Sequence, residues 1–186
     1  MKLPGRDESE TPLIVTTTID DSSFEYFNEL RRKHFPPERN FLRAHLTLFH
    51  HLPGERIDEV VKTLKSAAAM TAVFDAAFAG WFSLGRGVAM KVESAQLLQL
   101  RREVAREFSD VLNAQDRSWS RPHITIQNKV TPEESRELLR ALSSTFHPSV
   151  GTILGLQLWA YEGGPWRHIQ DLPFQQNYGR VIADAA

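Results

Sequence analysis

Cysteine is absent from the 186 residues of the chain. Its absence excludes disulfides, a thiolate nucleophile and cysteine metal ligands. The chain also lacks an apolar run of the ~18 residues that a membrane span needs, and its charged, polar start, residues 1–11, lacks the apolar core of a signal peptide. We therefore expect a soluble, cytoplasmic protein that has no membrane partner.

An excess of positive charge is missing as well. The chain has 22 basic and 23 acidic residues, and its formal net charge is −1. Proteins that bind long nucleic acids without sequence preference usually carry a basic surface. The charge balance therefore favours a small anionic ligand or a short RNA end, and we expect no DNA partner.

A five-residue pattern, R-x-H-x-T, occurs twice. It is found at Arg43–Thr47 and again at Arg121–Thr125. In both copies polar and apolar residues alternate, which is typical of a strand whose successive side chains point to opposite faces of a sheet. The Arg, His and Thr of each copy then share one polar face, and the residues between them pack on the core. A third H-x-[ST], His147–Ser149, contains a proline, so we interpret it as a turn.

The rest of the sequence predicts strands and helices in two similar halves. Strand patterns cover residues 13–19, 41–49, 72–83, 87–93, 149–161 and 166–172, together with the second motif, and helix patterns cover residues 22–34, 55–69, 94–113 and 131–144. After the first strand, each motif strand is followed by a helix and two strands. This order predicts an α+β fold in which two lobes turn their motif strands toward each other. We expect one domain, 12–174, between tails at 1–11 and 175–186.

Two histidines that face each other can transfer protons as a pair. Imidazole titrates near neutral pH, so one ring can accept a proton while the other donates one. Hydrolysis of a phosphodiester needs both transfers, because water must lose a proton and the leaving oxygen must gain one. In this interpretation His45 and His123 are the acid and base, and Thr47 and Thr125 donate hydrogen bonds to the non-bridging oxygens. The arginine that begins each copy adds positive charge at the rim.

Three other interpretations of the histidines remain open. A histidine on a strand is often a hydrogen-bonded structural residue. Two histidines can also bind zinc, although the chain has no H-x-H, no H-x-x-x-H and no acidic residue in either motif. A serine or cysteine hydrolase is disfavoured, because Gly-x-Ser-x-Gly and cysteine are both absent. We expect neither a metal nor another cofactor.

The two motifs, in the forms Ala44–Leu48 and Pro122–Ile126, resemble those of the 2H phosphoesterase superfamily, and especially those of the bacterial 2′-5′ RNA ligase-like proteins. The resemblance in layout covers residues 12–174. It implies a bilobal, duplicated α+β fold, with two antiparallel-rich sheets facing a central groove and helices on the outside. It also implies activity on 2′,3′-cyclic phosphates or 2′-5′ linkages of RNA or nucleotides, without a required metal.

The resemblance implies roles for individual residues. His45 and His123 are the expected acid–base pair, and Thr47 and Thr125 are the expected phosphate-holding hydroxyls. In relatives that open a cyclic phosphate, one histidine activates water and the other protonates the departing ribose oxygen. Which of the two histidines is the base stays open.

We assign substrate binding to three basic residues, Arg43, Arg121 and Lys129. Many relatives carry a basic residue five positions after the second motif histidine, where this chain has Asn128 followed by Lys129. By strand alternation, Gln127 and Lys129 share the polar face of the second motif.

Some aromatic and histidine residues are weaker candidates. Four aromatic residues are candidates for stacking on a nucleobase, although aromatics on strands more often belong to the core: Trp81, Phe82, Tyr161 and Trp166. His50 and His51 follow the first motif, and we interpret them as residues that shape a loop.

We predict a metal-independent phosphodiesterase that hydrolyses a cyclic phosphate or a 2′-linked phosphodiester by two-histidine acid–base catalysis. Its expected partners are RNA ends or a small cyclic nucleotide, and we expect a monomer. The alternatives are a 2′-5′ RNA ligase and a noncatalytic module that binds RNA or nucleotides. Ligation must hold two RNA ends together, and the near-neutral composition gives it little support.

Overall fold

The structure, a computed structural model, describes residues 11–176. The predicted N-terminal tail, 1–11, lies outside these residues except for its last position. The predicted C-terminal tail, 175–186, begins too early, because Gln175 pairs with Ala72 and accepts a hydrogen bond from the Val73 backbone. Residues 177–186 of that tail lie outside the described residues. No helix within 11–176 is long and apolar enough to cross a membrane.

The described residues form strands and helices close to the predicted ones. The strands are β1 Leu13–Ile19, β2 Leu46–Leu52, β3 Phe74–Ser83, β4 Val88–Glu93, β5 His123–Gln127, β6 Ser149–Tyr161 and β7 Trp166–Pro173. The helices are α1 Asp21–His34, α2 Ile57–Met70, α3 Ala95–Glu107, α4 Ala114–Arg117 and α5 Pro132–Ser144, with 3-10 turns at Pro37–Arg39 and Gly54–Arg56. The first motif strand begins at Leu46 rather than at residue 41, and the helix predicted to end at residue 113 ends at Glu107.

Capping residues explain where two of the helices begin. The Thr131 hydroxyl accepts the backbone N–H of Glu134 at 3.2 Å, and the Glu134 carboxylate accepts the backbone N–H of Thr131 at 2.8 Å. This reciprocal pair is a capping box for α5, and Pro132 occupies the first turn of the helix. The Asp20 carboxylate accepts the Ser23 backbone N–H at 3.0 Å, so Asp20 is the N-cap of α1.

The strands form one sheet that closes on itself. Their order is β1-β2-β5-β4-β3-β6-β7, and β1 also pairs with β6. We expected two sheets facing each other. A single barrel-like sheet forms instead, because the 13-residue strand β6 pairs with β3 at its start and with β1 and β7 along the rest of its length. The ring is completed where the two motif strands meet, through the single pair Leu46 and Ile124.

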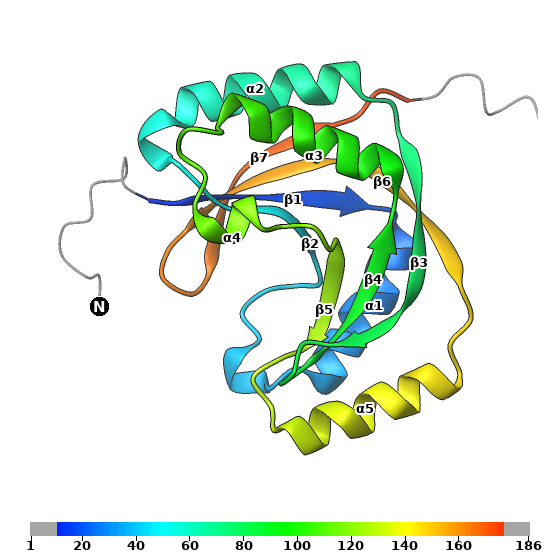
Figure 1. The fold of residues 1–186 in the computed structure, drawn as a ribbon. Helices are drawn as coiled ribbons and strands as arrows, with labels where there is room; N and C mark the ends of the chain where they lie inside the picture. Colours follow the sequence, from blue (N-terminus) through cyan, green and yellow to red (C-terminus); the bar gives the residue numbers. More distant parts are fainter. Residues whose placement is uncertain (1–10, 177–186) are drawn as a thin grey trace, which may run out of the picture.

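Helices cover the outside of this sheet (Figure 1). α2 and α3 lie side by side, with α2 over β6 and β7, whereas α5 packs on β3 and β4 and α1 packs on β5. One hydrophobic cluster includes residues from both halves of the chain. Leu46 and Ile124 are almost fully buried in it, and burying each such side chain contributes about 2 kcal/mol. The core therefore holds the two motif strands next to each other.

Candidate active site

The two motifs present their polar residues on one side of β2 and β5. Apolar residues of both motifs are buried, as the alternating pattern predicts: Ala44, Leu46, Leu48, Pro122, Ile124 and Ile126. His45, Thr47, His123 and Thr125 lie on the other side and are partly exposed. We call this side of the two strands the motif face.

Both motif histidines make the same contact with their own backbone. His45 Nδ1 lies 2.7 Å from the carbonyl oxygen of Arg43, and His123 Nδ1 lies 2.7 Å from that of Arg121. A carbonyl oxygen only accepts hydrogen bonds, so Nδ1 carries the proton in each neutral ring. This leaves Nε2 of both rings free to exchange a proton. His147 lies outside the motif strands, and its Nδ1 is 3.1 Å from the carbonyl oxygen of Thr145. This kind of contact alone therefore does not identify the site.

Burial and neighbouring positive charges keep both rings neutral. Burial, followed by the charges of Arg31, His50 and His123, lowers the pKa of His45 to about 4. Burial also lowers the pKa of His123, and the charges of His50 and Arg121 act in the same direction. Electrostatic interactions of this size fall off with distance. His45 and His123 each directly precede a residue of the pair Leu46 and Ile124, so both lie where the two motif strands meet.

Arg31 connects the two motifs from below the motif face. It is 4% exposed, and the described residues around it satisfy its guanidinium with oxygens. Its Nε donates to the carbonyl of Leu42 and to Oδ1 of Asn40, both at 2.9 Å, and its Nη1 donates to the carbonyl of Thr125 at 2.8 Å. The sequence analysis missed this residue, because a single arginine in an Arg-Arg-Lys stretch of a helix resembles a solvated charge.

The contacts of Arg31 explain why β2 begins late. Residues 40–44 turn oxygens toward Arg31, and the backbone N–H of Ala44 donates to Oδ1 of Asn28 at 3.1 Å. Their polar groups are therefore used by α1 rather than by a neighbouring strand. His45 lies just before the strand, in a segment that α1 holds in place.

The three basic residues assigned to substrate binding lie in different surroundings. The guanidinium of Arg43 points to α1, where it lies 3.0 Å from Glu25 Oε1 and 4.3 Å from the centre of the Phe24 ring. Arg121 is exposed, and its charge acts on His123. Lys129 follows the end of β5 in a left-handed conformation with φ 65°, so strand alternation does not apply to it. Of the three, Arg121 places its charge near His123, and Arg43 lines one pocket together with His45.

Two of the four candidate aromatic residues contact a motif histidine. The Trp166 ring lies 4.7 Å from the His45 ring, and the Phe82 ring lies 5.7 Å from the His123 ring. Trp81 packs instead on Phe27 in the core. Tyr161 lies opposite Trp166 at the end of the β6–β7 hairpin and makes no ring contact within residues 11–176.

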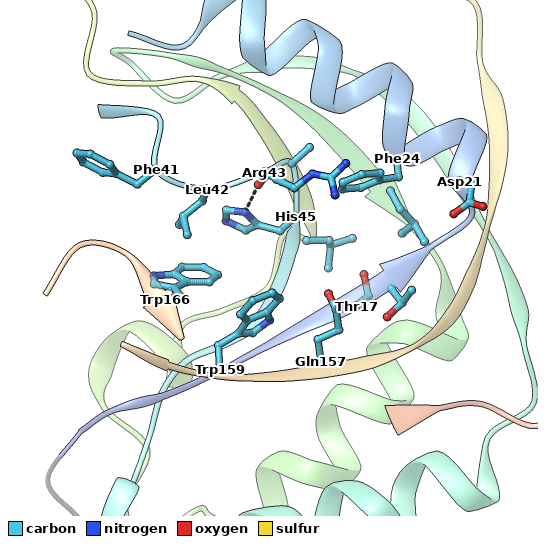
Figure 2. Close-up of a pocket in the computed structure, with 14 residues that line it drawn as sticks. Thr17, Asp21, Phe24, Phe41, Leu42, Arg43, His45, Gln157, Trp159 and Trp166 are labelled. Carbon is cyan, nitrogen blue, oxygen red and sulfur yellow. Dashed lines mark hydrogen bonds between the residues drawn. The ribbon is translucent and has the colours of Figure 1, made fainter. Parts of the chain in front are cut away.

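A pocket of about 390 Å³ opens beside His45 (Figure 2). Residues of β1, β6, β7 and the segment before β2 line it, and none of its lining residues comes from the second motif: Thr17, Thr18, Ile19, Asp21, Phe24, Phe41, Leu42, Arg43, Ala44, His45, Leu46, Gln157, Trp159 and Trp166. The rings of Phe41, Trp159 and Trp166 form an aromatic part of the wall. The hydroxyl of Thr17 is buried there without a hydrogen-bond partner. The pocket therefore belongs to the side of the site that His45 occupies.

Side chains that bind metal ions are not clustered in the described part of the chain. Within residues 11–176, no group of three or more His, Asp or Glu side chains is arranged to hold a metal ion. The polar groups that converge on the motif face are imidazole rings and threonine hydroxyls.

The chain is similar to a known protein family and to several solved structures. A family model described as the 2′-5′ RNA ligase superfamily matches residues 19–165. The structure of TT0787 from Thermus thermophilus superposes with a TM-score of 0.62 at 16% sequence identity, covering 90% of this chain and 100% of that chain. The structure of E. coli LigT complexed with 3′-AMP gives 0.59 at 16% identity, covering 89% and 99%. A structure described as a phosphoesterase gives 0.59 at 18% identity, covering 89% and 99%.

The TM-scores show that this chain shares its fold with these three structures. Comparison with curated protein sequences gave no match.

Proposed function

The chain belongs to the 2′-5′ RNA ligase superfamily of 2H phosphoesterases, and we propose that it is a metal-independent phosphodiesterase acting on 2′,3′-cyclic phosphates or 2′-5′ linkages of RNA ends or small nucleotides. We also propose that it works in the cytoplasm as a monomer, with two duplicated lobes that each supply one H-x-T motif. One observation carries the proposal. His45 lies just before β2 and His123 lies on the adjoining strand β5, and each ring keeps Nδ1 on a backbone carbonyl, which leaves Nε2 to exchange a proton.

In the proposed reaction the scissile phosphate lies on the motif face between the two rings. Nε2 of one histidine takes a proton from water as the water oxygen bonds to phosphorus. Nε2 of the other, protonated histidine gives its proton to the ribose oxygen as the phosphorus–oxygen bond breaks. The hydroxyls of Thr47 and Thr125 donate hydrogen bonds to the non-bridging oxygens, where negative charge increases. The two rings thus perform both proton transfers that hydrolysis requires.

The anionic substrate explains how one ring becomes an acid. In the free site both histidines have lowered pKa values, so both are neutral near neutral pH. A bound phosphate brings negative charge between them, and a nearby negative charge raises the pKa of an imidazole. One ring can then take up a proton on binding while the other stays neutral. The rate should therefore depend on pH with a maximum.

The pocket beside His45 supports a nucleotide or an RNA end as the substrate. E. coli LigT, which shares the fold, has been seen in complexes with 3′-AMP, NADP+ and ATP. In this chain Trp166 and Phe41 offer aromatic surface, and Thr17 and Gln157 offer polar groups next to it. Stacking on an aromatic side chain is worth about 1–3 kcal/mol per base and tolerates different bases. A nucleoside in this pocket would present its phosphate to the motif face.

The test is hydrolysis of a 2′,3′-cyclic nucleotide in excess EDTA, followed by phosphorus NMR. We expect turnover to a single product, either the 2′-phosphate or the 3′-phosphate, because the site fixes which oxygen is protonated. His147→Ala is a matched control, because His147 has the same H-x-[ST] pattern and the same backbone contact as the motif histidines but lies elsewhere. Its activity should equal that of the wild type, whereas His45→Ala and His123→Ala should lose most turnover.

The alternative functions and a metal-dependent mechanism predict other results, and the ligase direction is tested with two RNA ends as substrates. Absence of turnover with tight nucleotide binding would indicate a binding module. Joining of two RNA ends, one with a 2′,3′-cyclic phosphate and one with a 5′-hydroxyl, would indicate the ligase direction. Loss of turnover in EDTA that a divalent metal restores would reject the two-histidine mechanism.

A further inference from the structure

A third histidine, His50, lies on the motif face because β2 is bulged. The pairing of β2 with β1 shifts register between Thr47 and Phe49, so Leu48 is an extra residue in the strand. Leu48 and Phe49 are both almost completely buried, which moves the alternation by one position. The next partly exposed residue is His50. Simple alternation from Thr47 would have placed its side chain in the core. The interpretation of His50 as a loop residue is therefore wrong, since it lies within β2.

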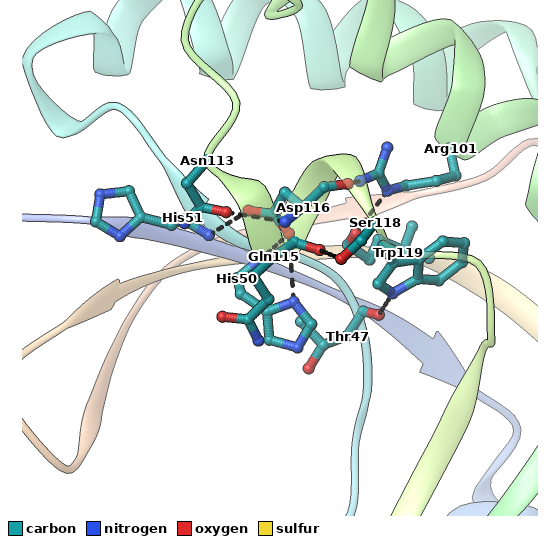
Figure 3. Close-up of polar contacts among 10 residues, drawn as sticks. Thr47, His50, His51, Arg101, Asn113, Gln115, Asp116, Ser118 and Trp119 are labelled. Atoms are coloured by element: carbon teal, nitrogen blue, oxygen red, sulfur yellow. Dashed lines mark hydrogen bonds and ion pairs between the residues drawn. The ribbon is translucent and has the colours of Figure 1, made fainter.

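Asp116, on α4, holds the His50 ring (Figure 3). His50 Nδ1 lies 3.3 Å from Asp116 Oδ1, and the same oxygen accepts the His50 backbone N–H at 2.9 Å. The other carboxylate oxygen accepts the His51 backbone N–H at 2.9 Å. Burial raises the pKa of Asp116, but the hydrogen bonds from His50 and His51 outweigh it, so the pKa lies below its usual range. The charged carboxylate only accepts hydrogen bonds, so the His50 proton stays on Nδ1.

The position of Asp116 is itself fixed by its surroundings. Its side chain is 1% exposed. Arg101, on α3, donates to the backbone carbonyls of both Asp116 and Leu48, which ties α4 to β2. Trp119, shortly after α4, makes a second contact with β2, because its Nε1 donates to the carbonyl of Thr47 at 3.0 Å. The carboxylate can therefore set the orientation of the His50 ring.

With Nδ1 on Asp116, Nε2 of His50 is left for a ligand. Within residues 11–176 no protein group hydrogen-bonds this atom. In Figure 3 the ring extends from Asp116 toward the side chain of Thr47. A charge on His50 lowers the pKa of both His45 and His123, so the ring lies within electrostatic reach of both. The charged and titratable groups near His50 include these two histidines, Asp116, and Arg101 on the far side of Asp116.

The second motif has no equivalent group. Five positions after the motif histidine, the first copy has His50 and the second has Asn128. β5 is bulged at the same place, since its register with β4 shifts between Thr125 and Gln127. The side chain of Asn128 accepts the backbone N–H of Lys129 at 2.8 Å, and an amide does not titrate. The bulge is shared by the two halves, whereas the titratable side chain is not.

We infer that His50 is a third phosphate-contacting histidine and that Asp116 is its positioning residue. This inference rests on the proposed function. Once protonated, Nε2 of His50 donates a charge-assisted hydrogen bond to a non-bridging phosphate oxygen, while Asp116 holds Nδ1 and balances the charge. His50 thereby supplies the cation of the first half of the site, where Arg43 is paired with Glu25.

Two substitutions of His50 separate its two nitrogen atoms. His50→Asn places an amide where Nδ1 contacts Asp116 but removes the group at Nε2. His50→Gln places an amide near the position of Nε2 but carries no charge. Hydrolysis of a 2′,3′-cyclic nucleotide should fall about 10- to 100-fold in kcat/KM for His50→Asn, the usual range for losing a hydrogen bond to a charged group. His50→Gln should keep more activity than His50→Asn, and its rate should lose the pH dependence that titration of His50 adds.

Asp116→Asn tests the positioning role through the pH profile. Without the negative charge, His50 loses its proton at lower pH, so the part of the profile that depends on protonated His50 should move to lower pH. Wild-type activity and an unchanged profile in His50→Asn would overturn the inference. Equal losses of activity and of melting temperature in His50→Asn and His50→Gln would also overturn it, since they indicate a structural role.

A binding measurement distinguishes failure of this inference from failure of the proposed function. Titration of wild-type protein with inorganic phosphate is followed through the imidazole nitrogen signals in NMR spectra, with His50→Asn used to assign the His50 signal. We expect phosphate to shift the Nε2 signal of His50, whether or not the protein hydrolyses a cyclic nucleotide. A shift without turnover would reject the proposed reaction and keep the phosphate contact. Turnover with no response of His50 would reject the contact.

Discussion

The two motif copies are alike in how they hold their histidines and differ in the groups that surround them. In each copy the histidine keeps Nδ1 on the carbonyl two residues earlier, at 2.7 Å, and the strand is bulged after the threonine. Each histidine also contacts one aromatic ring, Trp166 in the first copy and Phe82 in the second. These shared features are the ones that a base and an acid of similar geometry require.

The differences concern binding. The pocket of about 390 Å³ and the pair His50–Asp116 belong to the first copy, and an arginine free of ion pairs, Arg121, belongs to the second within the described residues. Arg43, its counterpart, is paired with Glu25. In the proposed function, the two copies share the proton transfer and the first copy alone binds the nucleoside. We therefore expect the same substitution to have similar effects in the two copies at the proposed catalytic residues. At the proposed binding residues its effects should differ between the copies.

The largest expected effect tests the symmetric part. His45→Ala and His123→Ala should each lower kcat by about 10³-fold, within the range of general acid–base catalysis. Because both rings act in one reaction step, the double substitution should lose little more than either single one. The measurement is kcat for a 2′,3′-cyclic nucleotide in all three variants. Losses that multiply, or one variant with nearly normal kcat, would show that the rings do not act as a pair.

The second-largest expected effect tests Arg31, which donates to Leu42 beside the first motif and to Thr125 in the second. Arg31→Met should lower the free energy of unfolding by about 3 kcal/mol, because the carbonyls of Leu42 and Thr125 lose a buried charged donor. Urea denaturation measures the loss. Arg32→Met is the matched control, since Arg32 is exposed and lies 3.9 Å from Glu25; such surface pairs contribute about 0–1 kcal/mol. Equal losses in the two variants would contradict the role of Arg31.

A smaller effect tests whether the hydroxyls are equivalent. Thr47→Val and Thr125→Val should each lower kcat about 100-fold, because each removes one donor to the charge that develops on the phosphate. Thr→Ser at either position should restore most of the rate. The relevant quantity is the ratio of the two losses. A loss confined to one position would show that one copy alone holds the phosphate oxygens.

Part of this comparison could be predicted from sequence, because it depends on neighbouring residues. The alternating burial of both motifs and the helix at residues 131–144 follow from local spacing, and the structure confirms them within about a residue. The strand 13–19 was predicted at its observed bounds, since a run of β-branched residues needs little context.

The rest depends on partners far away in the chain. Arg31 meets a carbonyl 94 residues later, and His50 meets a carboxylate 66 residues later, so no local pattern identifies either pair. The bulges follow from register with β1 and β4, and they explain why Gln127 is buried although alternation assigned it to the polar face. Arg43 was expected at the rim of the site, but Glu25 and Phe24 on α1 hold its guanidinium.

A further prediction tests the asymmetric part. Trp166 lines the pocket beside His45 and Phe82 does not, so Trp166→Ala should raise KM for a cyclic nucleotide about 10-fold. Phe82→Ala should change KM much less. Ribose 2′,3′-cyclic phosphate, which has no base, is the control substrate. If the loss in Trp166→Ala persists with that substrate, the tryptophan positions His45 rather than the base.

The smallest expected effect compares the two histidines through stability. A neutral buried histidine with a lowered pKa binds fewer protons in the folded state than in the unfolded state, so folding loses stability as the pH falls below the ordinary value. For His45 this window extends from the ordinary pKa of 6.5 down to about 4. Because the ring is partly exposed, solvent screening should limit the loss between about pH 7 and about pH 5 to about 1 kcal/mol.

His45→Gln removes this titration, so the stability advantage of the wild type over the variant should shrink as the pH falls, as measured by urea denaturation at both values. His123→Gln should show the same sign, because burial lowers the pKa of His123 as well. The charge of Arg31 acts on His45 but is not among the charges that act on His123, so the window should reach lower pH for His45. A wild-type advantage that grows on acidification would mean that the rings are stabilised in their charged form. The two copies would then begin the reaction protonated, and the proposed base would first have to lose a proton.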